Sequence, residues 1–245
     1  MNVFSRNSAT SCLAGEVIRK DLDAFSGGTT KFPNRIVAPE DAPRVLVGGE
    51  NNRKIGGRVA KGSWSGMKTY TLTLVERATC PAACAHLDDC YGDNMQWARR
   101  LVAGPGLVTC LDRELATLAA KHPAGLVVRL HVLGDFYSTD YVRSWAEWLR
   151  RHPNLHVYGY TGWLPESQIG RAVADLVSEF GWGRCAIRFS GGGLATRCAG
   201  RTSDKEARGR TPDGIVCLEQ TGQSGWCCTC TLCWASEQNV VFIDH

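Results

Sequence analysis

The chain has no long apolar run. No stretch of its 245 residues approaches the length of a membrane-spanning helix, and Met1 to Lys20 contain no continuous apolar segment of the kind that opens a secreted protein. We therefore expect no membrane contact and no export, and we place the protein in the reducing cytoplasm. With 44% hydrophobic residues, the chain is apolar enough to bury a full core.

The chain also lacks a phosphate-binding loop and a dense basic stripe. Gly191-Gly192-Gly193 is not followed in register by Lys-Ser or Lys-Thr, and no G-x-G-x-x-G opens a helix. A formal net charge of +4 permits a phosphate-bearing partner without requiring one. DNA or RNA is therefore a candidate partner, supported by the basic run from Arg197 to Arg210 and by loop tryptophans such as Trp226.

Composition divides the chain into three segments. Residues 1–65 are rich in Gly, Asn, Ser and Arg and predict an irregular N-terminal arm around the core. Residues 66–196 alternate strand and helix patterns and predict the core domain. Residues 197–245 carry basic residues followed by clustered cysteines, and they predict a Cys-rich C-terminal segment that binds metal.

The central segment reads as repeated strand-helix units. Strands are predicted at 70–75, 126–132, 155–160 and 185–189, and helices at 111–121, from Ser138 as N-cap to Leu149, and from Pro165 to Phe180. Such units require a parallel sheet, so we predict an α/β fold, a partial (β/α) barrel with parallel strands. Ligands gather at the carboxyl ends of such strands, where Cys80, Asp135, Thr161 and Ser190 all fall.

The cysteines are unevenly distributed. The chain has twelve, and most of them lie at 80–90 and 217–233 instead of spreading as a disulfide framework would. In a reducing compartment, clustered cysteines favour metal ligation over disulfide bonds.

The first cysteine group is the triplet Cys80, Cys84 and Cys90, with C-x3-C-x5-C spacing in one loop after the first core strand. Three thiolates can bind a [4Fe-4S] cluster and leave one iron open for a reactant. The alternative is structural zinc, with His86 as a fourth ligand. The triplet therefore predicts a soft-metal site, and we favour the reactive cluster.

The second group, Cys217, Cys227, Cys230 and Cys233, has enough ligands for a closed site. Zinc and a second [4Fe-4S] cluster both fit these four thiols, and Cys228 is left over. A different parse takes Cys228, Cys230 and Cys233 with His245 as a zinc site of three sulfurs and one nitrogen.

Three strand ends complete a resemblance to the radical SAM superfamily. The cysteine triplet is followed by Gly134-Asp135 after the second core strand and by Thr161-Gly162 after the third. The resemblance implies that the triplet binds the cluster, that Asp135 accepts hydrogen bonds from the ammonium group of S-adenosylmethionine, and that Thr161 and Ser190 line its pocket. It also implies an electron donor protein. The alternative for Asp135 is the N-cap of the helix that begins near Ser138.

The chain further resembles the uncharacterised gene product eighty-eight family of phage, plasmid and proteobacterial proteins. The matching segments are Ala78-Thr79-Cys80-Pro81 with Cys90-Tyr91-Gly92, Leu130 to Ser138, and Cys217 to Gly222 with Cys230-Thr231-Leu232-Cys233-Trp234. This family brings no settled activity with it.

These observations predict an iron-sulfur enzyme of the radical SAM type that modifies a nucleic-acid base or nucleotide. One alternative is a barrel guanine transglycosylase acting on tRNA or DNA, with structural zinc on Cys228, Cys230, Cys233 and His245, and with Asp135 as nucleophile. The other is a non-catalytic, metal-stabilised nucleic-acid-binding protein.

Overall fold

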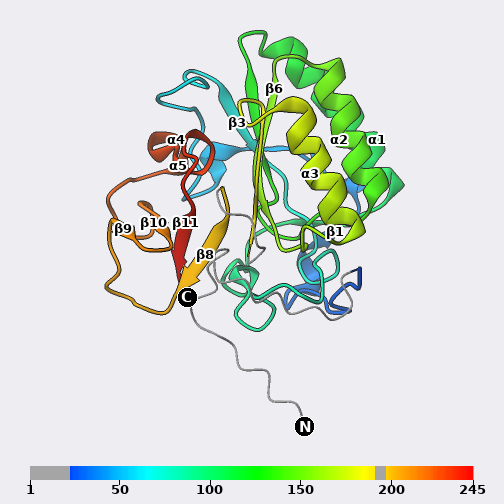
Figure 1. Ribbon diagram of the computed structural model, residues 1–245. Helices are drawn as coiled ribbons and strands as arrows, with labels where there is room; N and C mark the ends of the chain where they lie inside the picture. The colour runs from blue at the N-terminus through cyan, green and yellow to red at the C-terminus, as the bar shows by residue number, and fades with distance from the viewer. Residues whose placement is uncertain (1–22, 191–196, 245) are drawn as a thin grey trace.

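The computed structural model describes residues 23–190 and 197–244, and these form a mixed α/β fold (Figure 1). The main sheet has five strands in the order β2-β3-β5-β6-β7. Strands β3, β5, β6 and β7 run parallel, and β2 is antiparallel to β3. The strands are β2 (Val47–Gly48), β3 (Lys68–Thr71), β5 (Leu126–Leu130), β6 (Leu155–Thr161) and β7 (Cys185–Phe189).

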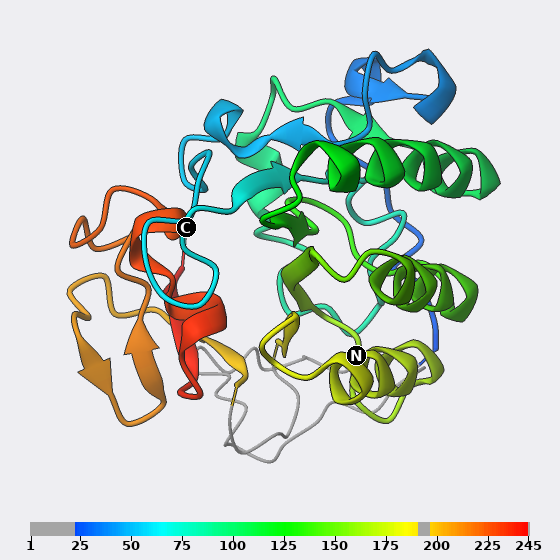
Figure 2. The same cartoon turned by 90° about the horizontal axis from the view of Figure 1, so that it is seen from above.

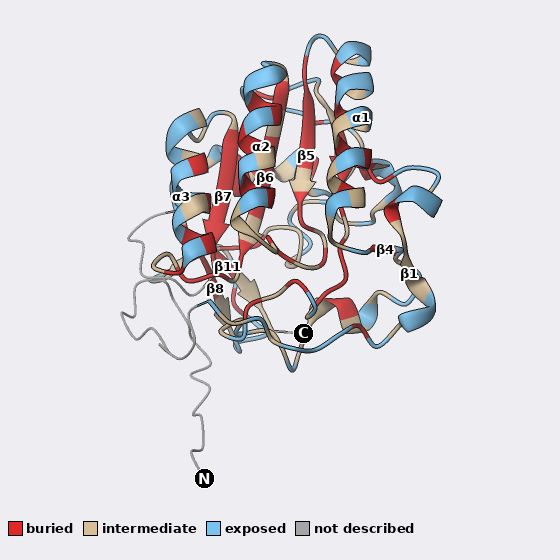
Figure 3. Cartoon of the chain, turned by 90° about the vertical axis from the view of Figure 1, so that its right-hand side faces the viewer, coloured by how far each residue is buried: buried red, intermediate tan, exposed pale blue. Residues whose placement is uncertain are grey.

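Three helices cover one face of this sheet: α1 (Pro105–Lys121), α2 (Thr139–Arg151) and α3 (Gln168–Phe180) (Figures 1 and 3). Figure 3 shows their outer sides exposed and the strands behind them buried. The side chain of Ser138 accepts a hydrogen bond from Tyr141 N, which confirms the predicted N-cap. The third helix begins at Gln168 and not at Pro165, because Ser167 caps it through Gly170 N.

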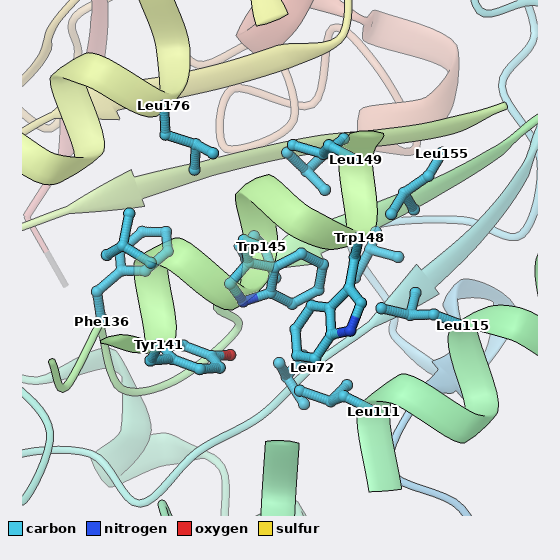
Figure 4. Packing of buried hydrophobic residues seen from close by; sticks show 14 of the residues in the cluster. Leu72, Leu111, Leu115, Phe136, Tyr141, Trp145, Trp148, Leu149, Leu155 and Leu176 are labelled. Atoms are coloured by element: carbon cyan, nitrogen blue, oxygen red, sulfur yellow. The ribbon is translucent and has the colours of Figure 1, made fainter. Parts of the chain in front are cut away.

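The core between helices and sheet is dominated by aromatic and leucine side chains (Figure 4). Trp145 and Trp148 of α2 pack edge to face, with ring centroids 4.9 Å apart. Leu111 and Leu115 of α1 and Leu155 of β6 are fully buried around them. The helical spacing of apolar residues therefore gives the packing that the sequence pattern predicts.

A second sheet of four strands lies beside the first, in the order β8-β11-β10-β9. Its strands are β8 (Ala199–Thr202), β9 (Arg210–Thr211), β10 (Gly214–Val216) and β11 (Val240–Ile243). A parallel bridge between Ser190 and Ala199 joins it to the end of β7. The predicted α/β class and parallel core are confirmed, and no closed barrel is seen in the described part of the chain.

The remaining elements are short. They are the two-stranded sheet β1 (Ile36–Val37) with β4 (Arg100–Leu101), the 3-10 helices η1 (Pro33–Arg35), η2 (Pro39–Asp41), η3 (Gly49–Asn51) and η4 (Tyr91–Asn94), and the one-turn helices α4 (Cys227–Cys230) and α5 (Leu232–Ala235). In residues 23–190 and 197–244, no helix is long and apolar enough to cross a membrane.

The face of the main sheet opposite the helices is covered by two segments that are far apart in sequence. Trp64 of the predicted N-terminal arm and Trp234 of α5 stack with ring centroids 5.4 Å apart, over Val127 and Tyr158. Figure 2 shows the loop around residue 60 next to α4 and α5. Residues 23–65 consist mostly of turns and short elements, and they also contribute buried core side chains.

Candidate metal centre at the carboxyl edge of the sheet

A cavity of about 290 Å³ lies at the carboxyl ends of the parallel strands. Most residues predicted from the sequence gather around it, from segments about 150 positions apart, although Cys230 does not line it. Those that line it are Cys80, Cys84, Cys90, Asp135, Thr161, Ser190, Cys217, Cys227 and Cys233. The two cysteine groups, which the sequence presents as separate sites, therefore share one cavity.

The loop that carries the first triplet is held by a buried ion pair. The Arg100 guanidinium Nε lies 2.8 and 3.0 Å from the two carboxylate oxygens of Glu76, and both side chains are at most 1% exposed. Arg100 also donates to the carbonyls of Gly92, Met95 and Ala98, which lie just after Cys90. The charge pair thus fixes the C-terminal half of the cysteine loop.

The N-terminal arm fixes the other half of the loop. Ser26 N donates to Cys80 O at 2.9 Å, and Ala82 N donates to Ala24 O at 2.8 Å. Phe25 packs edge to face on Trp163, with ring centroids 5.1 Å apart. The arm therefore pairs directly with the segment that holds Cys80.

The thiols of the first triplet lie close enough to affect one another. Burial raises the pKa of all three above the usual value for cysteine, and it raises the pKa of Cys84 to about 12. The neighbouring thiols Cys84 and Cys90 further raise the pKa of Cys80. Without a bound metal ion, these thiols stay protonated at neutral pH.

Asp135 ties together the turns that follow β5 and β6. Its Oδ1 accepts from Phe136 N at 2.7 Å and from Thr161 Oγ1 at 2.9 Å, and its Oδ2 accepts from Gly162 N at 2.7 Å. Burial raises its pKa to about 7, against the lowering effect of these donors. Asp135 does not cap α2, because Ser138 does.

Two glycines let the turns approach the cysteine loop. Gly134 has a φ of +76°, and a Cβ there would lie 2.5 Å from Thr79 Oγ1. A Cβ on Gly162 would lie 3.5 Å from Cys84 Sγ, so the turn after β6 reaches the triplet. The Gly-Asp and Thr-Gly pairs predicted as site elements therefore do lie beside the first cysteine group.

A second buried arginine holds the C-terminal cysteine segment. Arg188 of β7 is 0% exposed and donates to the carbonyls of Cys198, Leu232, Cys233, Ser236 and Gln238, at 2.7 to 3.3 Å. Trp182 Nε1 adds a bond of 2.8 Å to Trp234 O. These bonds seat α5 on the open face of the main sheet.

The thiols of the second group also interact. Burial raises the pKa of Cys217, Cys227, Cys230 and Cys233, and the pKa of Cys227 is raised further by the thiols of Cys233 and Cys217. Cys228 faces away from the cavity, because its Sγ lies 3.1 Å from Thr69 Oγ1 and donates to Gly56 O at 3.3 Å. His245 lies outside the described residues.

The side chains fit a soft-metal site by type and by place, but they do not form a closed coordination shell. All the described cysteines are free thiols. Over residues 23–190 and 197–244, no three His, Cys, Asp or Glu side chains converge closely enough to hold a metal ion between them. Each group of cysteines thus lines part of the cavity. The loops that carry them would have to move closer together for three thiols to bind one metal ion.

His86, the alternative zinc ligand, also lines the cavity. Its Nδ1 lies 3.9 Å from Asp89 Oδ1, on the exposed rim. The structure therefore leaves His86 near the first triplet without placing it among the thiols.

Three further side chains line the cavity and were not predicted from the sequence. Arg129 of β5 and Tyr158 and Tyr160 of β6 line the cavity on the face of the sheet opposite the helices. The guanidinium carbon lies 5.4 Å from the Tyr158 ring centroid and 4.7 Å from that of Tyr160. The feature of the sequence that could have indicated them is the single arginine in the otherwise apolar strand Leu-Val-Val-Arg-Leu.

Comparison with known proteins gives one match. The family model described as Gene product 88 matches residues 46–196. No curated protein and no solved structure matches the chain. The matched range contains the first triplet, Asp135, Thr161 and Ser190, and it ends before the second cysteine group.

Proposed function

We propose that this chain, which belongs to the Gene product 88 family, is a cytoplasmic iron-sulfur enzyme of the radical SAM type acting on a nucleic-acid base or nucleotide. One observation carries the proposal. Two groups of free, half-buried or buried thiols open onto a single cavity at the carboxyl ends of parallel strands, where α/β folds bind their ligands.

The state of the thiols supports a bound metal. Thiols whose pKa values are raised by burial are poor nucleophiles and gain little from being gathered in one place. A bound metal cation reverses this, because it deprotonates coordinating thiols outright. Sulfur donors select iron-sulfur clusters, zinc or copper(I) over harder ions. The grouping of Cys80, Cys84 and Cys90 therefore favours a soft-metal centre with one vacant position.

The chain also supports the partial-barrel arrangement that such an enzyme uses. The parallel bridge between Ser190 and Ala199 connects the end of β7 to the second sheet. In that sheet, β8, β11 and β10 run parallel to one another. Residues of this second sheet, such as Phe242 and Ile243, line the same cavity as the main sheet. The two sheets thus wrap around the proposed reaction chamber.

In this proposal, the protein holds the reactants through its strand ends. A [4Fe-4S] cluster on Cys80, Cys84 and Cys90 would supply an electron to S-adenosylmethionine, and an electron donor protein would replace that electron. Thr161 and Ser190 lie on the wall next to Asp135. Asp135 Oδ2 accepts one bond, from Gly162 N, so it keeps a lone pair for an ammonium group.

The cysteines of the second group would hold a second [4Fe-4S] cluster or zinc. The transglycosylase alternative needs Cys228 as a ligand, but its Sγ is engaged by Thr69 and Gly56 on the far side of α4. This placement favours Cys217, Cys227, Cys230 and Cys233 as the ligand set.

Anaerobic purification followed by iron, sulfide and zinc analysis tests the proposal. We expect brown protein that absorbs near 400 nm and contains about four to eight irons. Cys84→Ala should lose the iron of the first cluster, whereas Cys110→Ala and Cys228→Ala should keep all of it, because Cys110 is buried on α1 and Cys228 faces Thr69.

Colourless protein with stoichiometric zinc and no iron after anaerobic reconstitution would contradict the iron-sulfur proposal. Equal iron loss in Cys84→Ala and Cys110→Ala would also contradict it, since the loss would then come from weakened folding and not from a missing ligand. Circular dichroism of each variant separates the two causes.

A further inference from the structure

Arg129 presents its guanidinium to the cavity with few protein acceptors. Its Nη1 donates to Leu130 O at 2.6 Å, and this is its one hydrogen bond to the described part of the protein. The group can donate five such bonds. Unlike Arg100 and Arg188, which are 0% exposed and fully engaged in holding loops, Arg129 is half-buried and lines the cavity wall.

Four of the five carboxylates that line the cavity have other basic partners. The ion pairs are Glu76 with Arg100, Asp89 and Asp244 with Arg201, and Glu219 with Lys54. The fifth, Asp135, is near enough for its pKa to be lowered by the Arg129 charge, but Arg129 has no carboxylate within 4.0 Å among residues 23–190 and 197–244. The Arg129 guanidinium is therefore left without an ion pair in the described part of the chain.

One tyrosine hydroxyl beside Arg129 is also unpaired. The Oη of Tyr158 is buried and has no hydrogen-bond partner in the described structure. The buried hydroxyl of Tyr160 instead lies against the thiol of Cys233, whose pKa it lowers. Buried polar atoms almost always have a partner, so the Tyr158 hydroxyl beside the cavity indicates a ligand or ordered water.

We propose that Arg129 and Tyr158 form a subsite that binds the phosphate or carboxylate group of a small ligand. Guanidinium and phenol donors on one wall match the acceptor oxygens of such an anion, and charge-assisted bonds of this kind are among the strongest in proteins. A cavity of about 290 Å³ lies at the lower end of the size of small-molecule sites, so the ligand is no larger than about one nucleotide.

This inference rests on the proposed function for the chemistry that follows binding. A rival role for Arg129 is to offset the charge of metal-bound thiolates at Cys227 and Cys233, whose pKa values its charge already lowers. The two roles differ in a measurable way, because only the ligand subsite makes affinity depend on an anionic group of the ligand.

Binding of two matched pairs of probes to anaerobically purified protein tests the subsite. Adenosine 5'-monophosphate and adenosine differ by a phosphate, and S-adenosylmethionine and decarboxylated S-adenosylmethionine differ by a carboxylate. We expect the anionic member of at least one pair to bind about tenfold or more tightly than its partner, and we expect Arg129→Gln to abolish that preference. Preference in the first pair identifies a phosphate, and preference in the second a carboxylate.

Three further variants separate ligand binding from a general effect on the fold. Tyr158→Phe removes an unpartnered hydroxyl without changing the ring, and it should weaken the anionic probe several-fold while the protein stays folded. Arg129→Lys keeps the charge and should retain part of the preference. Arg113→Gln alters an arginine on α1, on the other face of the sheet, and should change nothing.

Two results would overturn the subsite. One is a wild-type protein that shows no preference in either pair. The other is an Arg129→Gln variant that keeps the preference. Iron analysis of the same samples separates this outcome from failure of the iron-sulfur proposal: loss of iron with unchanged probe preference assigns Arg129 to the thiolates of Cys227 and Cys233.

Discussion

The two cysteine-bearing segments reach the same cavity but are held there by different forces. Residues 77–99 form an irregular loop fixed by ion pairs, and residues 217–235 form short turns and helices fixed by backbone hydrogen bonds and aromatic packing. The first loop has few apolar residues, so ion pairs have to fix its conformation. The second segment contains tryptophans, so packing of these side chains in the core can fix it.

The ion pairs of the first loop form a connected set. Glu76 binds Arg100 in the core and also accepts from Thr30 Oγ1 at 2.6 Å. On the surface side, Asp93 binds both Arg77 and Lys31, at 2.9 and 2.6 Å. Such pairs hold geometry well, but each buried charge depends on its partner.

The second segment depends on one arginine and one aromatic stack. Arg188 collects the carbonyls of the turn from Leu232 to Gln238, and Trp234 lies flat on Trp64, with 10° between the ring planes. The segment is thereby tied to both the sheet and the N-terminal arm. The comparison indicates that the two cysteine groups should respond differently to loss of charge, which the following predictions test.

The largest effect is expected for Arg188→Met. This change removes the donors to five buried carbonyls at once, so we expect the free energy of unfolding to fall by about 5 kcal/mol. Urea unfolding followed by circular dichroism measures the loss. Arg150→Met, which breaks an exposed pair with Glu179, should change the free energy of unfolding little. Similar losses in the two variants would show that the carbonyl cluster is not the anchor.

The next effect is the pH dependence carried by Asp135. Its pKa is about 7 in the folded protein and about 4 in the unfolded chain, so the unfolded state releases its proton first as pH rises. Stability from this group is fully present below about pH 4 and is lost as pH rises to about 7. The loss amounts to roughly 4 kcal/mol across this window.

Asp135→Asn should remove that dependence, and the difference between the unfolding free energies of wild type and variant should fall with rising pH between about pH 4 and 7. Asp175→Asn, an exposed carboxylate on α3, provides the control. A difference that is flat, or that rises with pH, would mean that the donors from Phe136, Thr161 and Gly162 outweigh burial.

A smaller effect is expected for Glu76→Gln. The variant keeps the hydrogen bond with Thr30 and leaves the Arg100 charge buried without its carboxylate, so we expect a loss of about 3 kcal/mol. Metal analysis sharpens the comparison. Under the iron-sulfur proposal, Glu76→Gln should deplete the first cysteine group and spare the second, whereas Arg188→Met should do the reverse. Equal depletion of both groups would show that the cavity behaves as one unit.

Periodicity predicted most of the core correctly. The strands at Leu126, Leu155 and Cys185 and the Ser138-capped helix were found because apolar spacing and capping residues act locally. The start of α3 was misplaced because Pro165 suits a first helical turn as well as Ser167 suits an N-cap, and the Ser167 side chain formed the bond.

The sequence placed Cys80, Asp135, Thr161 and Ser190 at one edge, and the structure brings them to one cavity. It did not predict that the second cysteine group would share that cavity, because the position of residues 217–235 depends on long-range contacts from Arg188 and Trp64. No local pattern encodes such contacts. The second sheet was missed for a similar reason, since its strands have at most four residues.

The pairing of Cys227 N with Lys54 O and of Cys228 N with Ile55 O has a consequence for biosynthesis. The segment near residue 55 pairs with the segment near residue 227, so a ribosome must make about 170 further amino acids before the first segment meets its partner. Until then, the sheet face around Val127 and Tyr158 is exposed to water. An incomplete chain therefore exposes an apolar surface, and under the iron-sulfur proposal cofactor loading comes late in synthesis.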